Sequence, residues 1–122
     1  MLRMLTCRVM PFAAVLGFAA AATAMPLAAA GQDAAQAKKG EDVYTAQKCS
    51  MCHSIAGKGN KLSPLEGVGT KLTADQIREW IVNPTEMATK TKSTKKPPMP
   101  AKYGKLPKEE IDALVAYMQS LK

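Results

Sequence analysis

The sequence is poor in the residues that build most metal sites and disulfide frameworks. It has one histidine, His53, and three cysteines, of which only Cys49 and Cys52 lie beyond residue 30. A structural zinc site needs four ligands, and no second cysteine pair is present to complete one. A disulfide between Cys49 and Cys52 would close a very small loop and would restrict the unfolded chain little. These absences argue against a zinc domain and a disulfide-stabilised scaffold.

Aromatic residues are also scarce, at 5% of the chain, and the 17 lysines and arginines are not interleaved with them. An interface with nucleic acid is therefore not expected. No segment alternates apolar and polar residues as a half-buried strand does, and no internal repeat is visible. The 122 residues allow one small domain, which we predict to be all-α with long loops.

Acidic residues are missing from the first 30 positions, and this segment has the features of a secretory signal peptide. Two arginines precede a run without charge that begins at residue 9 and closes with small residues. We predict a signal peptide over residues 1–30, with cleavage after Ala24 or Ala30, and a periplasmic mature protein. A retained membrane anchor is the alternative, because about 20 apolar residues span a bilayer. The run is rich in alanine and interrupted by two prolines, which favours cleavage.

The mature chain is predicted to consist of a flexible leader, residues 31–36, and a folded domain, residues 37–122. Cleavage after Ala30 would remove two arginines and lower the formal charge from +7 to +5. A basic exported protein is expected to prefer acidic partners. A domain of this size is marginal on apolar burial alone. A large buried cofactor is therefore expected to complete the core.

Three segments have helical patterns. The first runs from about residue 37 to 48, where Gly40 costs about 1 kcal/mol relative to alanine and suggests that another helix crosses closely. The second begins with a capping-box pattern at Thr73 and ends before Pro84. The third begins near Pro107 and has an apolar stripe. The intervening residues, 55–70 and 85–105, are rich in glycine, proline or lysine and are predicted to be loops.

The segment Cys49-Ser-Met-Cys-His53 has the C-x-x-C-H pattern for covalent haem attachment. Residues three apart share one face of a helical turn, so Cys49 and Cys52 can form thioethers with two vinyl groups on one porphyrin edge. His53 then presents a ring nitrogen to the iron. A redox-active dithiol also uses C-x-x-C, but it is expected in a βαβ setting. We predict one haem c, attached through Cys49 and Cys52, with His53 as an axial ligand of the iron.

A methionine is the expected second axial ligand, and its thioether raises the reduction potential. Met99 lies between prolines, which restrict the backbone and hold the sulfur in place. Met51 is inside the attachment motif, Met118 belongs to the apolar stripe of the last helix, and Met87 is the alternative ligand. We predict that Met99 binds the iron. A loop methionine that only fills a gap in the core is the other interpretation.

These residues resemble the class I cytochrome c family over about residues 37–121. Gly40 and Tyr44 are similar to the glycine and aromatic of the family's first helix, which pack across the last helix, and Tyr117 occupies the matching position there. The resemblance implies a small all-α cytochrome c-like fold, with three to four helices and long loops around one covalently bound haem. It also implies an electron carrier and not an enzyme.

The resemblance extends to both sides of the haem. Trp80 is similar to the aromatic that faces the haem on the methionine side, with an ordinary core tryptophan as the alternative. The loop over residues 65–69 resembles the one on the histidine side, where a proline carbonyl accepts a hydrogen bond from the axial histidine. Here Ser63 occupies that register and Pro64 is displaced by one residue, so the resemblance leaves the acceptor open.

The implied function is that of a monomeric periplasmic protein that carries single electrons in a respiratory chain. Lysines on both sides of Met99 would offer a docking surface to an acidic redox partner, with a solvated loop as the alternative. These are Lys90, Lys92, Lys95, Lys96, Lys102 and Lys105. A haem subunit of a larger periplasmic oxidoreductase complex is the alternative function. A ligand sensor or peroxidase-like protein, which needs an open iron site, is a third.

Overall fold

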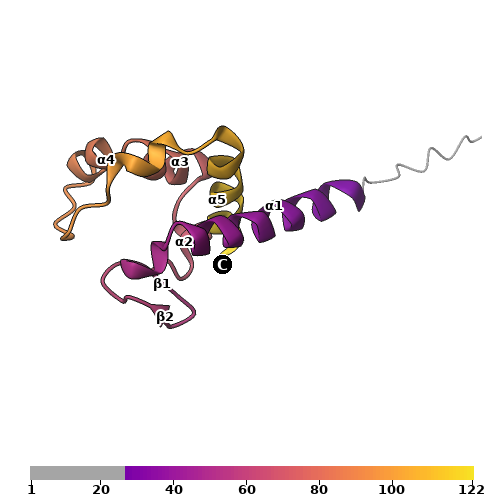
Figure 1. The fold of residues 1–122 in the computed structure, drawn as a ribbon, viewed down its shortest axis with the longest axis horizontal. Helices are drawn as coiled ribbons and strands as arrows, with labels where there is room; N and C mark the ends of the chain where they lie inside the picture. Colours follow the sequence, from indigo (N-terminus) through magenta and orange to yellow (C-terminus); the bar gives the residue numbers. More distant parts are fainter. Residues whose placement is uncertain (1–26) are drawn as a thin grey trace, which may run out of the picture.

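The computed structural model describes residues 27–122 and confirms the all-α class (Figure 1). Most of the predicted signal peptide, including the Ala24 cleavage site, lies outside the described residues. The elements are α1 (Leu27–Ala46), a 3-10 turn (Cys49–Met51), β1 (Ser54–Ile55), β2 (Lys58–Gly59), α2 (Val68–Lys71), α3 (Ala74–Val82), α4 (Pro84–Lys90), a second 3-10 turn (Ala101–Lys105) and α5 (Lys108–Ser120). Among these residues, no helix is both long and apolar enough to cross a bilayer.

The first helix is longer than predicted. α1 begins at Leu27, well before the expected start near Ala37, so residues 31–36, for which a flexible leader is predicted, are part of this helix. Alanine has the highest helix propensity, and the alanines on both sides of Gly31 outweigh the cost of that glycine. Cleavage after Ala30 would therefore remove the beginning of α1.

Two short helices replace parts of the predicted loops, which gives five α-helices in the described chain where three to four were expected. Pro84 ends α3, as predicted, but it also starts α4. A proline suits the first helical position, because its φ is already helical and its missing N–H is not needed there. α2 is a single turn that begins after Gly67, which has a φ of 69°.

A two-stranded hairpin also lies in a predicted loop. β1 and β2 pair antiparallel, with Ser54 opposite Gly59. The two turn residues, Ala56 and Gly57, have φ values of 50° and 74°. Positive φ at both positions is the geometry of the tight turns that suit two-residue hairpins. Strands of two residues are too short to show an alternating pattern, which is why the sequence did not reveal them.

α3 begins with the predicted capping box. The Thr73 hydroxyl accepts a hydrogen bond from the Gln76 N–H at 3.2 Å, and the Gln76 side chain accepts one from the Thr73 N–H at 2.9 Å. Both bonds satisfy N–H groups that have no partner inside the helix. The start of α3 is thereby fixed, and the helix directs Ile77 and Ile81 into the core.

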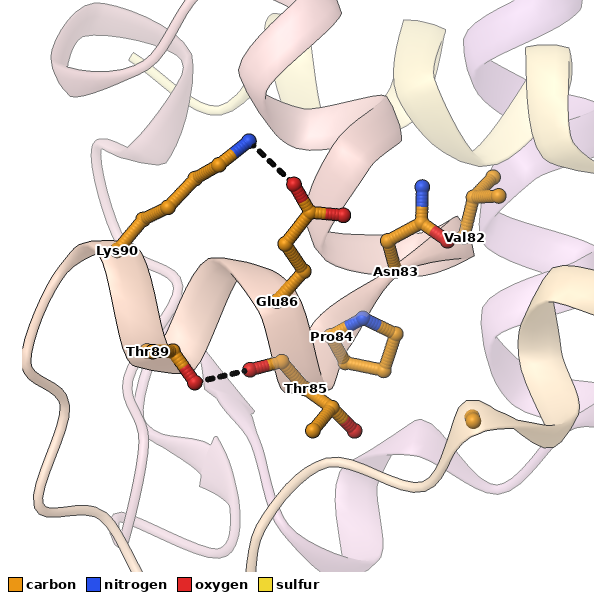
Figure 2. A pocket seen from close by; sticks show the side chains of 8 residues that line it. Val82, Asn83, Pro84, Thr85, Glu86, Thr89 and Lys90 are labelled. Atoms are coloured by element: carbon orange, nitrogen blue, oxygen red, sulfur yellow. Dashed lines mark hydrogen bonds and ion pairs between the residues drawn. The ribbon is translucent and has the colours of Figure 1, made fainter.

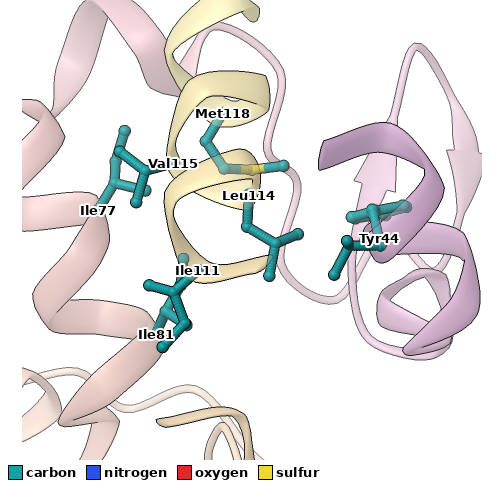
Figure 3. Close-up of a cluster of buried hydrophobic side chains, with 8 residues drawn as sticks. Tyr44, Ile77, Ile81, Ile111, Leu114, Val115 and Met118 are labelled. Atoms are coloured by element: carbon teal, nitrogen blue, oxygen red, sulfur yellow. The ribbon is translucent and has the colours of Figure 1, made fainter. Parts of the chain in front are cut away.

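α5 lies at the centre of the core, between α3 and α1 (Figure 3). Side chains from α3 pack on one side of it, and Tyr44 from α1 lies on the other. The apolar stripe predicted for the last helix is confirmed, since four of its members are buried. The buried cluster consists of Val43, Tyr44, Ile77, Ile81, Ile111, Leu114, Val115 and Met118.

α1 and α5 cross in direct contact at Gly40, as predicted from the position of this glycine within a helix. A Cβ atom at Gly40 would lie 2.6 Å from the Cβ of Tyr117 on α5. Beside this point the rings of Tyr44 and Tyr117 meet edge to face, with centroids 5.9 Å apart. Such aromatic pairs stabilise a contact beyond the area that they bury. The crossing fixes the end of α1, from which the attachment motif follows.

Candidate functional site

The predicted attachment motif forms one helical turn directly after α1. Lys48 adopts the left-handed conformation, with a φ of 54°, and the turn begins at the next residue. The N–H groups of Cys52 and His53 both donate to the Cys49 carbonyl, at 3.1 and 3.0 Å. Cys49 and Cys52 are partly buried and are free thiols. The structure thus brings Cys49, Cys52 and His53 together on one turn.

Two observations count against a redox dithiol or a zinc site at this turn. Burial raises the pKa of the Cys49 thiol, whereas the reactive cysteine of a redox dithiol has a lowered pKa. A zinc site would need several ligands close together. Although Cys49, Cys52 and His53 share one turn, no three His, Cys, Asp or Glu side chains in the described part of the chain lie close enough together to hold a metal ion.

The His53 ring is held by a backbone carbonyl of the following loop. Its Nδ1 lies 2.8 Å from the Ser63 carbonyl oxygen. Because a carbonyl only accepts, Nδ1 must carry the hydrogen, and Nε2 then keeps the lone pair with which imidazole binds a metal. Ser63 is therefore the acceptor that the sequence left open. The acceptor is at the position that the resemblance predicts, although a serine occupies it and the proline follows one residue later.

Further bonds hold the backbone around His53, and the sequence did not predict them. The Tyr44 hydroxyl donates to the His53 carbonyl at 3.2 Å, and burial raises the pKa of Tyr44 to about 12. The Ser63 N–H donates to the Cys52 carbonyl at 3.2 Å. Tyr44 was noted only as a packing residue, because no sequence pattern reveals a hydrogen bond to a distant backbone atom.

Met99 lies in the segment between α4 and the second 3-10 turn. It is partly buried and packs against the same core cluster as Cys49. Its neighbours Pro98 and Pro100 are exposed, so Met99 turns inward from a loop that is otherwise at the surface. Inward packing is what the ligand prediction requires, although iron ligation itself remains a prediction.

The other methionines have ordinary positions. Met118 lies in the core on α5, as predicted, and Met87 is buried in α4 with 8% of its surface exposed. Met51, inside the attachment motif, is 68% exposed. Packing therefore accounts for Met87, the alternative ligand, while Met99 is the methionine presented by a loop.

Trp80 lies on α3 and is partly buried. Its neighbours on the helix, Ile77 and Ile81, belong to the buried core cluster, but Trp80 does not. An ordinary core tryptophan would be part of that cluster. This position leaves part of the indole available to a bound group, so contact with haem remains the prediction for Trp80.

All six lysines of the predicted docking surface are exposed. Lys90 pairs with Glu86 at 2.6 Å, and Lys95 donates to the Leu62 carbonyl at 3.3 Å. The charge of Lys90 is therefore partly neutralised. The remaining four, Lys92, Lys96, Lys102 and Lys105, form no ion pair with any residue from 27 onward that the structure describes.

A shallow hollow of about 450 Å³ lies between α4 and the second 3-10 turn (Figure 2). Pro84, Thr85 and Glu86 line it from α4, and Ala101 lines it from the turn. None of the predicted haem-binding residues lines this hollow. It is a feature of the surface beside the Met99 segment and is separate from the attachment motif.

Several apolar side chains near the attachment motif are only partly covered by the rest of the chain. Among large apolar side chains that the structure describes, the least exposed is Ile77, at 3%. Partly buried apolar residues from the segments after Cys52 and around Met99 border the core. The chain therefore offers two thiols, a histidine with a free nitrogen, a methionine and apolar side chains, the set that a haem requires.

Comparison with known proteins identifies the family. Neither the curated proteins nor the solved structures give a significant match to this chain. The family model described as Cytochrome c matches residues 37–122, which is most of the chain and includes the attachment motif. A covalently bound c-type haem is the cofactor of this family. The chain belongs to the cytochrome c family and is a haem-binding electron-transfer protein.

Proposed function

We propose that this protein is a periplasmic electron carrier in which Cys49 and Cys52 hold the haem and His53 and Met99 are the axial ligands of its iron. The hydrogen bond of 2.8 Å between His53 Nδ1 and the Ser63 carbonyl carries the proposal. It directs Nε2 as a metal ligand and fixes the plane of the ring. The bound haem supplies one-electron redox chemistry.

The chain's own residues keep the site rigid during transfer. The Ser63 carbonyl holds the His53 ring, and the Tyr44 hydroxyl holds the His53 backbone. Prolines on both sides of Met99 restrict the loop that presents its sulfur. A site whose ligands move little between the two oxidation states exchanges electrons without a large rearrangement. Trp80 is proposed to cover one face of the haem.

The exposed lysines support transient docking of an acidic redox protein. They flank Met99 in the sequence, and Lys92, Lys96, Lys102 and Lys105 form no ion pair with a described acidic residue. Attraction between unlike charges accelerates encounter and weakens with salt. The proposed carrier therefore acts as a monomer that binds its donor and its acceptor in turn and performs no substrate chemistry.

Optical spectra of the exported, haem-matured protein test the ligand set. Haem that stays with the chain on denaturing electrophoresis would establish thioether attachment. The weak far-red band of an iron–methionine bond is expected in the wild type and in Met87→Leu, and is expected to vanish in Met99→Ala. A far-red band that survives in Met99→Ala would refute the ligand assignment and leave the attachment through cysteine intact.

Cell fractionation and an intact mass test the proposed location. Recovery from the periplasm of a protein whose intact mass matches a chain that begins directly after Ala24 or Ala30 would support export with cleavage. Recovery of the full-length chain in the membrane fraction would instead support the retained anchor.

One observation favours the alternative, a haem subunit of a larger periplasmic complex. Met51 and Leu62 are 68% and 39% exposed. Asn60 joins their backbones, since its Nδ2 donates to the Met51 carbonyl at 3.0 Å and its Oδ1 accepts from the Leu62 N–H at 2.9 Å. Exposed apolar side chains beside the attachment motif suit a lasting interface. Gel filtration of the native protein at high salt separates the two functions, because only a stable complex keeps its size there.

A further inference from the structure

Glu66 closes the loop that follows His53. Its Oε1 accepts a hydrogen bond from the Ser54 hydroxyl at 3.2 Å and another from the Gly57 N–H at 3.1 Å. Its Oε2 lies 3.4 Å from the same hydroxyl. Ser54 directly follows His53 and is only 1% exposed, so the carboxylate supplies the partner that a buried hydroxyl needs. The contact joins residues that are 12 positions apart in the chain.

The same carboxylate holds the turn of the β1–β2 hairpin. Ala56 has a φ of 50°, a conformation that costs energy for a residue with a Cβ and persists only where its surroundings impose it. The hydrogen bond from the Gly57 N–H to the exposed carboxylate of Glu66 is such a constraint. The hairpin is thus fastened to Glu66 at both Ser54 and Gly57.

The hairpin in turn packs on the backbone of His53. A Cβ atom at Gly59 would lie 2.3 Å from the His53 carbonyl oxygen, so β2 contacts that peptide group directly. The Leu65 N–H donates to the Ser54 carbonyl at 2.9 Å. Ser63 lies between these two constraints, and its carbonyl receives the His53 hydrogen bond. A loop closed at Glu66 therefore holds this carbonyl at a defined place.

We infer that Glu66 is a positioning residue, which acts with Ser54 to hold the Ser63 carbonyl against His53 and thereby sets the orientation and basicity of the axial imidazole. The inference rests on the proposed function in one respect, because His53 must be the iron ligand. A strong hydrogen bond at Nδ1 makes the imidazole a better donor and favours ferric iron. Loosening the loop weakens that bond and raises the reduction potential.

The experiment uses the haem-matured full protein and three variants. Glu66→Gln keeps the size of the side chain but removes its charge, and Ser54→Ala removes the hydroxyl but keeps the charge of Glu66. Glu109→Gln is the matched control, because Glu109 is exposed on α5 and forms no ion pair within the described chain. The readouts are the exchange rate of the His53 Nδ1 proton with solvent, measured by NMR on the reduced protein, and the reduction potential.

Glu66→Gln and Ser54→Ala are each expected to accelerate exchange of the Nδ1 proton about tenfold, as the loss of a hydrogen bond to a charged group implies, and to raise the potential. Glu109→Gln is expected to change neither. A potential that rises in Glu66→Gln with unchanged exchange, and with no effect of Ser54→Ala, would show that Glu66 acts only through its charge and would overturn the inference. Unchanged exchange in both variants would overturn it as well.

The wild-type protein separates this failure from failure of the proposed function. If the NMR spectrum of the wild type shows no iron-bound imidazole, His53 is not the ligand, and both proposals fall. If it shows one whose Nδ1 proton already exchanges freely, only the positioning role of Glu66 falls. If the wild type shows a protected Nδ1 proton and the variants do not alter it, again only the positioning role of Glu66 falls. Should Ser54→Ala not fold, the nearly isosteric Glu66→Gln still decides the question through the exchange rate.

Discussion

Gly40 on α1 lies directly against the Ala113 carbonyl on α5, because a Cβ at Gly40 would come within 2.0 Å of that oxygen. The obstructing atoms belong to the backbone of a buried helix and cannot rotate aside as a flexible side chain can. The two helices are therefore as close as their backbones allow. Since Cys49 follows the end of α1, this contact also positions the attachment turn relative to the core.

Gly40→Ala is predicted to lower the free energy of unfolding by about 2 kcal/mol or more. Overpacking costs about 1–3 kcal/mol and sometimes more, and a contact with backbone leaves little room for relaxation. The gain of about 1 kcal/mol in helix propensity offsets only part of this cost. Denaturant unfolding of the haem-loaded protein measures the difference.

Gly57→Ala is the matched control for this substitution. Gly57 has a φ of 74°, but a Cβ there would meet nothing within 4 Å. Only backbone strain of about 1–2 kcal/mol is expected. A smaller loss in Gly40→Ala than in Gly57→Ala would contradict the crossing described above.

The parts of the fold that could be predicted are those whose signal is local. The capping box at Thr73, the stop at Pro84 and the apolar stripe of α5 each depend on neighbouring residues. The Gly40 crossing could be predicted because a glycine in a helix carries a cost that needs a reason. The extension of α1 and the start of α4 were missed, because alanines near a cleavage site and a proline after a helix each permit two structures.

The sequence predicts side chains for the candidate site but does not indicate the backbone groups that hold them. The C-x-x-C-H spacing indicates Cys49, Cys52 and His53, and the structure places them on one turn. The acceptor at Ser63 is a backbone carbonyl, which every residue has, so no residue type indicates it. The role of Glu66 depends on contacts with Ser54 and Gly57 that form only when the loop closes.

Tyr44→Phe is predicted to lower the free energy of unfolding by about 1 kcal/mol at neutral pH, because it removes the hydroxyl that donates to the His53 carbonyl at 3.2 Å. Tyr117→Phe is the control, since the Tyr117 hydroxyl forms no hydrogen bond with a described residue although its ring packs on Tyr44. Equal losses in the two variants would show that the Tyr44 hydroxyl contributes nothing. Chemical denaturation at pH 7 makes the comparison.

Ionisation of Tyr44 is also predicted to lower the free energy of unfolding at alkaline pH. Burial raises its pKa from 10.0 to about 12 in the folded protein. The folded state then binds the phenolic proton more tightly than the unfolded state, so this contribution is complete below pH 10 and disappears as the pH rises through 12. The wild type should therefore lose more stability between pH 10 and about pH 12 than Tyr44→Phe does. Parallel stability curves in this window would contradict the assignment.

Asp112 is predicted to stabilise the contact between α3 and α5, and this contribution is predicted to be lost at acid pH. Hydrogen bonds from Lys108 and then Arg78 hold its pKa below 3.8, and Arg78 belongs to α3. The contribution is present above pH 3.8 and is lost as the pH falls through the lowered pKa. Asp112→Asn should reduce the melting temperature slightly at pH 7 and have less effect near pH 2, whereas Asp33→Asn should change neither. A loss that is equally large at both pH values would indicate packing instead of charge.

Neutralising one lysine is predicted to slow electron transfer to an acidic redox protein. The effect should be larger for a lysine without an acidic partner than for one in an ion pair. Lys96→Gln is expected to lower the second-order rate constant roughly threefold at low ionic strength, because no described acid pairs with Lys96. Lys90→Gln should have a smaller effect, since Glu86 lies 2.6 Å from Lys90. Lys38→Gln is the control, because Lys38 lies on α1 and is paired with Asp42 at 2.9 Å. Stopped-flow rates that fall equally in all three variants would show a dependence on net charge and no docking surface.

The haem-free chain is predicted to unfold without a cooperative transition. The buried cluster that α1, α3 and α5 build consists of eight residues, and a domain of this size is marginal on apolar burial alone. Replacing both Cys49 and Cys52 by alanine removes the thioethers, and circular dichroism should then show reduced helix content and a broad thermal transition. Met99→Ala, which keeps both cysteines and is expected to keep the haem, should still unfold sharply at a lower temperature. A sharp transition in the haem-free chain would mean that the contacts of α5 with α1 and α3 suffice, so that the cofactor would be bound by a core that is already complete.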